Sequence, residues 1–86
     1  MFAACQPQFE KIENYHAEEG VSREASTIEE CQASCLSEGH HCIAFDWDRT
    51  DEPWQGYRCW LHLNTIDVVP EIDTDHYPRI RCSHCI

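Results

Sequence analysis

The chain has 86 residues, 7 of them cysteines, and its 16 Asp and Glu against 6 Lys and Arg give a formal net charge of −10 at pH 7. This length suits one domain, and so short a chain buries too little surface for its core alone to make it stable. The negative charge argues against nucleic acid and anionic membranes as partners. No apolar run is long enough for a membrane span.

So many cysteines in so short a chain predict a disulfide scaffold, and hence a secreted or extracellular protein, including one stored in secretory organelles. The alternative is a zinc-binding domain, which requires two Cys-x2-Cys pairs. Only Cys82-Ser83-His84-Cys85 has that spacing. The segment 1–4 is too short for a signal peptide. We therefore expect a mature fragment or one domain of a longer protein.

The N-terminal part of the chain predicts little regular structure. Residues 6–15 carry a weak strand pattern, and 16–26 form a polar loop with a short strand near Val21. The first clear element is a helix over 27–38. Apolar side chains then recur on one face of that helix, at Ile28, Cys31 and Cys35.

Both ends of this helix carry the expected signals. Ser26 or Thr27 can accept hydrogen bonds from the first free N–H groups, and a glutamate follows each of them three residues later. Gly39 suits the left-handed conformation that follows many helices.

The second half of the chain predicts strands. Residues 42–47 and 57–63 alternate in side-chain type, with a polar loop between them, which indicates a long-looped antiparallel hairpin. A short strand over 65–69 and an acidic turn over 71–75 follow. Residues 76–82 read as an edge strand, because Pro78 cannot donate to a central ladder. The fold class is α+β: one helix packed on a small twisted antiparallel sheet.

These motifs together resemble the PAN/apple family. The resemblance rests on a helix with two cysteines four apart, a cysteine-bearing hairpin and a cysteine near each end, which here are Cys31, Cys35, Cys42, Cys59, Cys5 and Cys82. The strands 42–47 and 59–61 carry the family's flanking aromatic residues. The resemblance implies a single domain over 1–86 with a core of about 5–82.

The resemblance also implies the disulfide pairing, which spacing alone does not fix. The implied bridges are Cys5–Cys82, Cys31–Cys59 and Cys35–Cys42. Cys85 is then left over. It is a free thiol, it forms an interchain bridge, or it takes the place of Cys82 in the bridge to Cys5.

Three clusters contain residue types that occur in reactive or metal-binding sites: 40–42, 82–85 and 46–52. We expect His40 and His41 to be loop residues, and Cys42 and Cys82 to be disulfide-bonded, so that neither cysteine segment binds a metal. The acidic stretch 46–52 lacks the EF-hand spacing and is expected to be a solvated hairpin loop, with Asp46 or Asp48 capping the turn. We expect most histidines on the surface, and no catalytic residue or cofactor.

The ligand-binding candidates are the aromatic and basic residues of the hairpin: Trp47, Arg49, Trp54, Tyr57, Arg58 and Trp60. Exposed aromatic rings with polar neighbours suit a sugar ring or a partner protein. Alternation places the Cys59 side of its strand against the helix, and Trp54 is expected in the exposed loop. Arg79 and Arg81 are expected to protect an edge strand from aggregation.

The resemblance implies a non-enzymatic extracellular adhesion or recognition module that binds a protein or glycan on a cell surface or in extracellular fluid. It would be one domain of a larger secreted or surface protein, with sister domains in tandem as one arrangement. The acidic balance disfavours heparin-like ligands and leaves neutral glycans, a basic protein surface, or sialylated glycans held by local arginines. The alternative is a structural module cross-linked through Cys85 into a disulfide-linked dimer.

Overall fold

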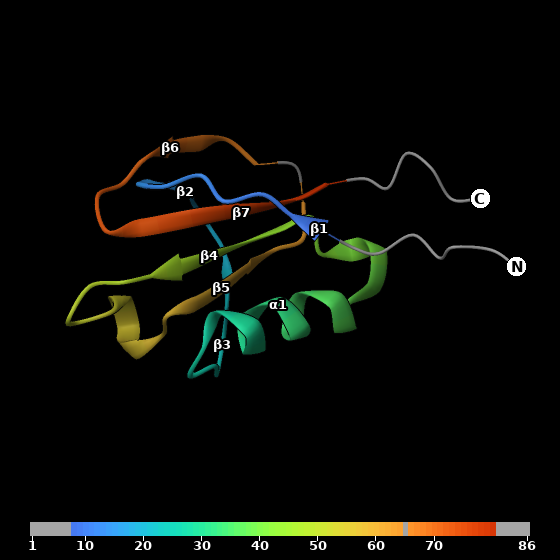
Figure 1. The fold of residues 1–86 in the computed structure, drawn as a ribbon, viewed down its shortest axis with the longest axis horizontal. Coiled ribbons are helices and arrows are strands. Elements are labelled where there is room, and N and C mark those ends of the chain that lie inside the picture. Colours follow the sequence, from blue (N-terminus) through green and yellow to red (C-terminus); the bar gives the residue numbers. More distant parts are fainter. Residues whose placement is uncertain (1–7, 65, 81–86) are drawn as a thin grey trace, which may run out of the picture.

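The computed structural model describes residues 8–64 and 66–80. Its elements are β1 (Gln8–Phe9), β2 (Tyr15–Ala17), β3 (Val21–Arg23), α1 (Ile28–Ser37), η1 (Gly39–His41), β4 (Ala44–Asp48), η2 (Trp54–Gly56), β5 (Cys59–His62), β6 (Val68–Pro70) and β7 (Thr74–Ile80). Five strands form an antiparallel sheet in the order β1-β7-β4-β5-β3, and β2 pairs with β6. The α+β class is therefore confirmed (Figure 1).

Helix α1 begins and ends at the predicted signals. Thr27 is the N-cap, and its side chain accepts a hydrogen bond from the backbone N–H of Glu30 at 3.1 Å. The carboxylate of Glu30 accepts in turn from the backbone N–H of Ser26 at 2.6 Å. Gly39 follows the helix with φ of 69°, a conformation that glycine adopts without a Cβ penalty.

The helix covers one face of the sheet, over β4 and β5 (Figure 1). Cys31 and Cys35 are fully buried on the inner face of the helix. The structure contains the bridges Cys31–Cys59 and Cys35–Cys42, with S–S distances of 2.08 and 1.98 Å. The first joins the helix to β5, and the second closes the loop after the helix. Both are pairings that the family resemblance implied.

The core lies between the helix and the sheet. Its largest members are Phe45 and Leu61, both fully buried, and the ring of Tyr77 stacks on Phe45 with centroids 4.7 Å apart. Trp47 also faces this core and is 8% exposed. The side of β5 that carries Cys59 thus packs against the helix, as alternation predicted.

The expected edge position of the last strand is wrong. Strand β7 pairs with β4 over Thr74–Pro78 and with β1 at Arg79 and Ile80, so it lies inside the sheet. Pro78 is tolerated because its backbone polar groups face β1. Its carbonyl accepts a hydrogen bond from the N–H of Glu10 at 3.1 Å. Proline has no backbone N–H to donate, and the missing donor would also face the short strand β1, so no hydrogen bond to β4 is lost.

Several predicted boundaries also shift. The hairpin strands run over 44–48 and 59–62 rather than 42–47 and 57–63. The acidic turn ends at Asp73, because Thr74 and Asp75 already belong to β7. Among the described residues, neither the length nor the composition of any helix suits a membrane crossing.

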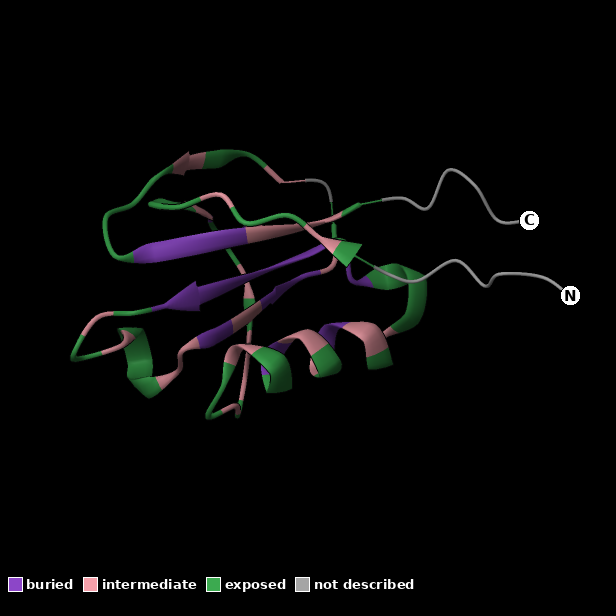
Figure 2. Cartoon of the chain, in the orientation of Figure 1, coloured by how far each residue is buried: buried purple, intermediate pink, exposed green. Residues whose placement is uncertain are grey.

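The second face of the sheet is covered by polypeptide from β2. The backbone N–H of Ala17, at the end of β2, donates to the carboxylate of Asp46 in β4 at 3.0 Å. Every residue of β4 and the first three residues of β7 are buried, the polar ones included (Figure 2). Polar side chains therefore form part of the protein interior here.

Candidate functional site

An aromatic cluster lies at the end of the β4–β5 hairpin. The rings of Trp54 and Trp60 are 5.3 Å apart between centroids, and Tyr57 approaches Trp60 edge-on at 6.2 Å. The Trp60 Nε1–H donates to the backbone carbonyl of Tyr57 at 2.8 Å, which fixes the indole. Trp54 is 66% exposed. The cluster therefore presents a fixed, solvent-facing aromatic surface.

The loop that carries Trp54 is fixed by Asp48. Its carboxylate accepts from the backbone N–H of Thr50 at 2.9 Å and from that of Trp54 at 3.1 Å. This agrees with the sequence expectation that Asp48 caps the hairpin turn. An exposed indole held in this way loses little conformational entropy when it binds a ligand.

A cleft of about 750 Å³ runs from this aromatic surface to the segment between β2 and β3. Trp54 and Trp60 form its apolar wall. Five carboxylates also line it: Glu18, Glu19, Asp46, Asp48 and Glu71. Its described lining contains no lysine and no arginine. The cleft therefore combines indole rings with a strongly negative potential.

A smaller hollow of about 330 Å³ lies on the other side of the hairpin end, where Tyr57 and Arg58 meet the segment before α1. Arg58 is not free there. Its Nη1 donates to the backbone carbonyls of Asp48 and Thr50 at 2.8 and 2.7 Å. Arg58 thus stabilises the base of the loop, and Tyr57 and Arg58 line a different hollow from the carboxylate-lined cleft.

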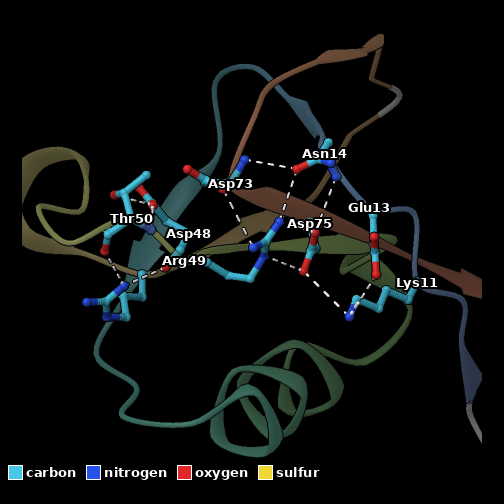
Figure 3. A network of polar contacts seen from close by, with 9 residues as sticks. Lys11, Glu13, Asn14, Asp48, Arg49, Thr50, Asp73 and Asp75 are labelled. Atoms are coloured by element: carbon cyan, nitrogen blue, oxygen red, sulfur yellow. Dashed lines mark hydrogen bonds and ion pairs between the residues drawn. The ribbon is translucent and has the colours of Figure 1, made fainter.

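Arg49 pairs with a buried carboxylate. Its guanidinium donates to both oxygens of the buried Asp75, at 2.9 and 3.2 Å, and to Asn14 at 3.0 Å (Figure 3). These contacts with Asp75 raise the pKa of Arg49. Lys11 also approaches Asp75, with an N–O distance of 3.8 Å. Arg49 therefore satisfies a buried carboxylate and ties β4 to β7.

Arg79 is engaged in the same way. It donates to the backbone carbonyls of Gly39 and Cys42, at 2.7 and 3.3 Å. Arg79 therefore binds the loop after the helix. It does not protect an unpaired strand edge, because β7 lies inside the sheet. Arg81 lies outside the described residues.

The floor of the cleft is a buried polar cluster of Asp46, His62 and His76, all at most 2% exposed. The carboxylate of Asp46 lies between the two imidazoles: Oδ2 is 2.7 Å from His62 Nε2, and Oδ1 is 2.6 Å from His76 Nδ1. These residues come from β4, β5 and β7, three neighbouring strands. Asp46 therefore caps no turn, because it binds histidines in the interior.

This environment sets the ionisation of Asp46. Burial alone raises the pKa of a carboxyl group, but the hydrogen bonds from His62, His76 and the Ala17 N–H outweigh it here. The pKa of Asp46 is therefore lowered below its ordinary value. Nδ1 of His62 is buried and has no hydrogen-bond partner among the described residues.

The comparisons with known proteins decide the family. The family model described as the PAN domain matches residues 5–82. The chain belongs to the PAN domain family. No curated protein and no solved structure matched it. PAN domains are in general non-enzymatic modules of extracellular proteins that bind proteins or carbohydrates.

In this PAN domain the six predicted ligand-binding residues lie in four different places. Trp54 and Trp60 line the large cleft. Tyr57 and Arg58 line the small hollow. Trp47 belongs to the helix-side core, and Arg49 pairs with Asp75. The bridge Cys5–Cys82 and the state of Cys85 lie outside the described residues and stay predictions.

Sequence reasoning missed His62 and His76, because most histidines were expected on the surface. One signal was present: alternation puts Trp60 and His62 on the side of β5 away from the helix. It could not show that this side is buried, because its cover comes from β2, which is distant in sequence.

Proposed function

We propose that this PAN domain is an extracellular recognition module whose Trp54–Trp60 cleft binds a basic surface of a partner protein. The observation that carries the proposal is the cleft's composition: two indoles, five carboxylates and, among its described residues, no lysine or arginine. A Lys or Arg side chain gains from the face of an indole and from nearby carboxylates at once. The net charge of −10 also steers basic partners toward the domain.

A neutral glycan is the second candidate. The exposed ring of Trp54 and the carboxylate acceptors around it offer a stacking surface and hydrogen-bond partners for a sugar. A sialylated or sulfated glycan fits poorly, because Arg49, Arg58 and Arg79 are already bound to protein groups. The negative lining would also repel it.

A pair of peptides of equal length and opposite charge tests the first candidate. The intrinsic tryptophan fluorescence is titrated with a lysine-rich peptide and with a glutamate-rich peptide of the same length, at low and high salt. We expect only the lysine-rich peptide to change the emission, with an affinity that falls as salt rises. No response to the lysine-rich peptide contradicts the proposal.

Matched variants then separate the cleft from overall charge. Glu18→Gln with Glu19→Gln removes two cleft carboxylates, whereas Glu29→Gln with Glu30→Gln removes two on the first turn of α1. We expect a clear loss of peptide affinity only for the first pair. Equal losses would mean that net charge alone attracts the peptide. Binding of a neutral glycan that is insensitive to salt and lost in Trp54→Ala would favour the second candidate.

We further propose that the domain belongs to a larger secreted or surface protein. The buried disulfides Cys31–Cys59 and Cys35–Cys42 support this, because such bridges persist in oxidising compartments. The flanking sequence tests it: a signal peptide or further PAN domains would agree with the proposal, and a cytosolic enzyme domain would not.

A further inference from the structure

We propose that Asp46, His62 and His76 form a binding site for a divalent transition-metal ion, with Zn²⁺ as the expected ion. The donor atoms of the three side chains all lie within 4.8 Å of one another. They come from three neighbouring strands, so the site is held by the sheet and does not depend on a loop. His76 is the direct cross-strand partner of Asp46 on β7, and His62 lies two residues beyond Trp60, the partner of Asp46 on β5.

The donor chemistry selects the ion. Two imidazole nitrogens and one carboxylate are a common ligand set for Zn²⁺ and similar borderline ions. Ca²⁺ and Mg²⁺ prefer a shell made of oxygen atoms, which this cluster does not provide. One ring nitrogen of each histidine already faces the carboxylate, so the three donor groups converge on one place.

An ion requires the three groups to rearrange around it. Ligand atoms around a tetrahedral Zn²⁺ are about 3.3 Å apart, given bonds of about 2.0 Å. The two N–O distances of 2.7 and 2.6 Å would therefore open by about 0.6 Å. An imidazole binds an ion through an unprotonated nitrogen, so a neutral ring bound through Nε2 of His62 or Nδ1 of His76 carries its proton on the other ring nitrogen, Nδ1 of His62 or Nε2 of His76. Water from the cleft can take a fourth position.

The surroundings both support and limit the site. The Ala17 N–H donates to Asp46 Oδ2 at 3.0 Å, an outer contact of the kind that orients ligating carboxylates. A Cβ on Gly20 would come within 3.0 Å of the His62 ring, so close backbone packing keeps that ring in place. Nδ1 of His62, however, has no acceptor among the described residues. The missing outer contact predicts an affinity about 10–100-fold below that of fully supported sites.

An ion can reach the site through the cleft. Asp46 is part of the cleft lining, together with Trp60 and Thr74. Among the three residues of the cluster, Asp46 is the one that lines the cleft. This entry path does not depend on the cleft's ligand, so the metal site and the proposed recognition function can fail separately.

Zn²⁺ titration of the 86-residue chain, purified without chelator and then stripped of metal, tests the site. We expect one ion per chain by calorimetry and a melting temperature about 6–11 °C higher at a free Zn²⁺ concentration ten times the Kd. Nitrogen-15 NMR of the imidazoles identifies the ligands without any substitution. Nε2 of His62 and Nδ1 of His76 should shift, whereas the rings of His16, His40 and His41 should not.

His76→Gln and the exposed-residue control His40→Gln complete the test. We expect His76→Gln to lose at least about 10-fold in Zn²⁺ affinity and His40→Gln to bind as the unchanged chain does. The absence of Zn²⁺ binding, or shifts confined to surface histidines, overturns the proposal. Because the NMR readout uses the unsubstituted chain, it decides the question even if His76→Gln does not fold.

Discussion

Asp46 lies directly opposite Trp60 across the β4–β5 pair, with both side chains on the face away from the helix. The aromatic wall of the cleft and its buried polar floor are therefore neighbours on the same strands. A change in the packing of Trp60 is therefore expected to affect Asp46, and the reverse, because the two strands hold these residues opposite each other. The separate contributions of wall and floor can be measured with substitutions at each.

A substitution of Trp54 tests the contribution of the aromatic wall of the cleft to binding. Trp54→Ala should lower the affinity for the lysine-rich peptide by about 10-fold or more, since an exposed aromatic anchor is lost. Its effect on the free energy of unfolding should stay within about 0.5 kcal/mol because the ring is 66% exposed. Tyr15→Ala, an exposed aromatic residue outside the cleft lining, is the control and should bind normally. Unchanged binding in Trp54→Ala would contradict the site assignment.

Arg49 tests the distinction between ligand binding and structure. Among the described residues, Arg49→Ala leaves the buried carboxylate of Asp75 with Lys11 at 3.8 Å and the N–H of Asn14 at 3.3 Å. We expect a clear drop in the urea midpoint, because a buried charge without its partner is unfavourable. The control is Arg23→Ala, which breaks a half-exposed pair with Glu38 and should change stability little.

The ligand readout separates the two explanations for Arg49. Arg49→Lys keeps the charge but loses the two-pronged contact with Asp75, so it should recover only part of the stability. Peptide affinity, measured below the unfolding transition, should be unchanged in both variants. A loss of peptide affinity without a loss of stability would show that Arg49 contributes to ligand binding.

The ionisation of Asp46 makes the stability of the fold depend on pH. Its pKa is lower in the folded state than in the unfolded chain, so the ionised carboxylate stabilises the fold above about pH 3.9, and this contribution is lost as the pH falls through the folded pKa. Asp46→Asn should be less stable at neutral pH by about 1.5–3 kcal/mol. It should also lose less stability than the unchanged chain between about pH 5 and pH 2.5.

Urea unfolding in the presence of a chelator, repeated across that pH range, measures the effect. Asp51→Asn is the control, because Asp51 is exposed in the hairpin loop. Parallel acid profiles for Asp46→Asn and the unchanged chain would show that the Asp46 carboxylate does not contribute to acid stability.

The sequence predicted the elements whose signals are local. The helix was foreseen because Thr27, Glu30 and Gly39 act within one turn of its ends, and the hairpin because alternation is a property of each strand alone. The exposure of Trp54 followed from its place in a polar loop. Each of these features depends on residues that are close along the chain.

The features that were predicted wrongly or missed depend on pairing between strands that are far apart in the sequence. Pro78 suggested an edge strand, but β1, about seventy residues earlier in the sequence, pairs with β7 and accommodates the proline. Likewise, Asp46, His62 and His76 meet only because β4 lies between β5 and β7, and because β2 covers them. No periodicity within one segment carries that information.

Cys85 remains to be tested by chemistry, because it lies outside the described residues. We expect Cys85→Ser to keep the bridge between Cys5 and the C-terminal peptide, which non-reducing peptide mapping detects. Loss of that bridge would assign Cys85 as the partner of Cys5. If the unchanged chain also runs as a dimer on a non-reducing gel and Cys85→Ser does not, Cys85 forms the interchain link.

The two observed disulfides should contribute unequally to stability. Cys31–Cys59 spans 28 residues and Cys35–Cys42 spans 7. The chain-entropy model gives about 3.6 kcal/mol for the longer loop and about 2.4 kcal/mol for the shorter one. Replacing each pair with alanines removes two buried sulfur atoms in both cases, so each double variant serves as the control for the other.

Calorimetric or urea unfolding of the two double variants measures this difference. We expect the variant without Cys31–Cys59 to be the less stable by about 1 kcal/mol, because its unfolded chain regains more freedom. This bridge also ties α1 to β5, the strand that carries Trp60 and His62. Its loss should therefore weaken peptide binding in the cleft, whereas loss of Cys35–Cys42 should not. The reverse order of stabilities would mean that packing around the sulfurs, and not loop length, sets their contribution.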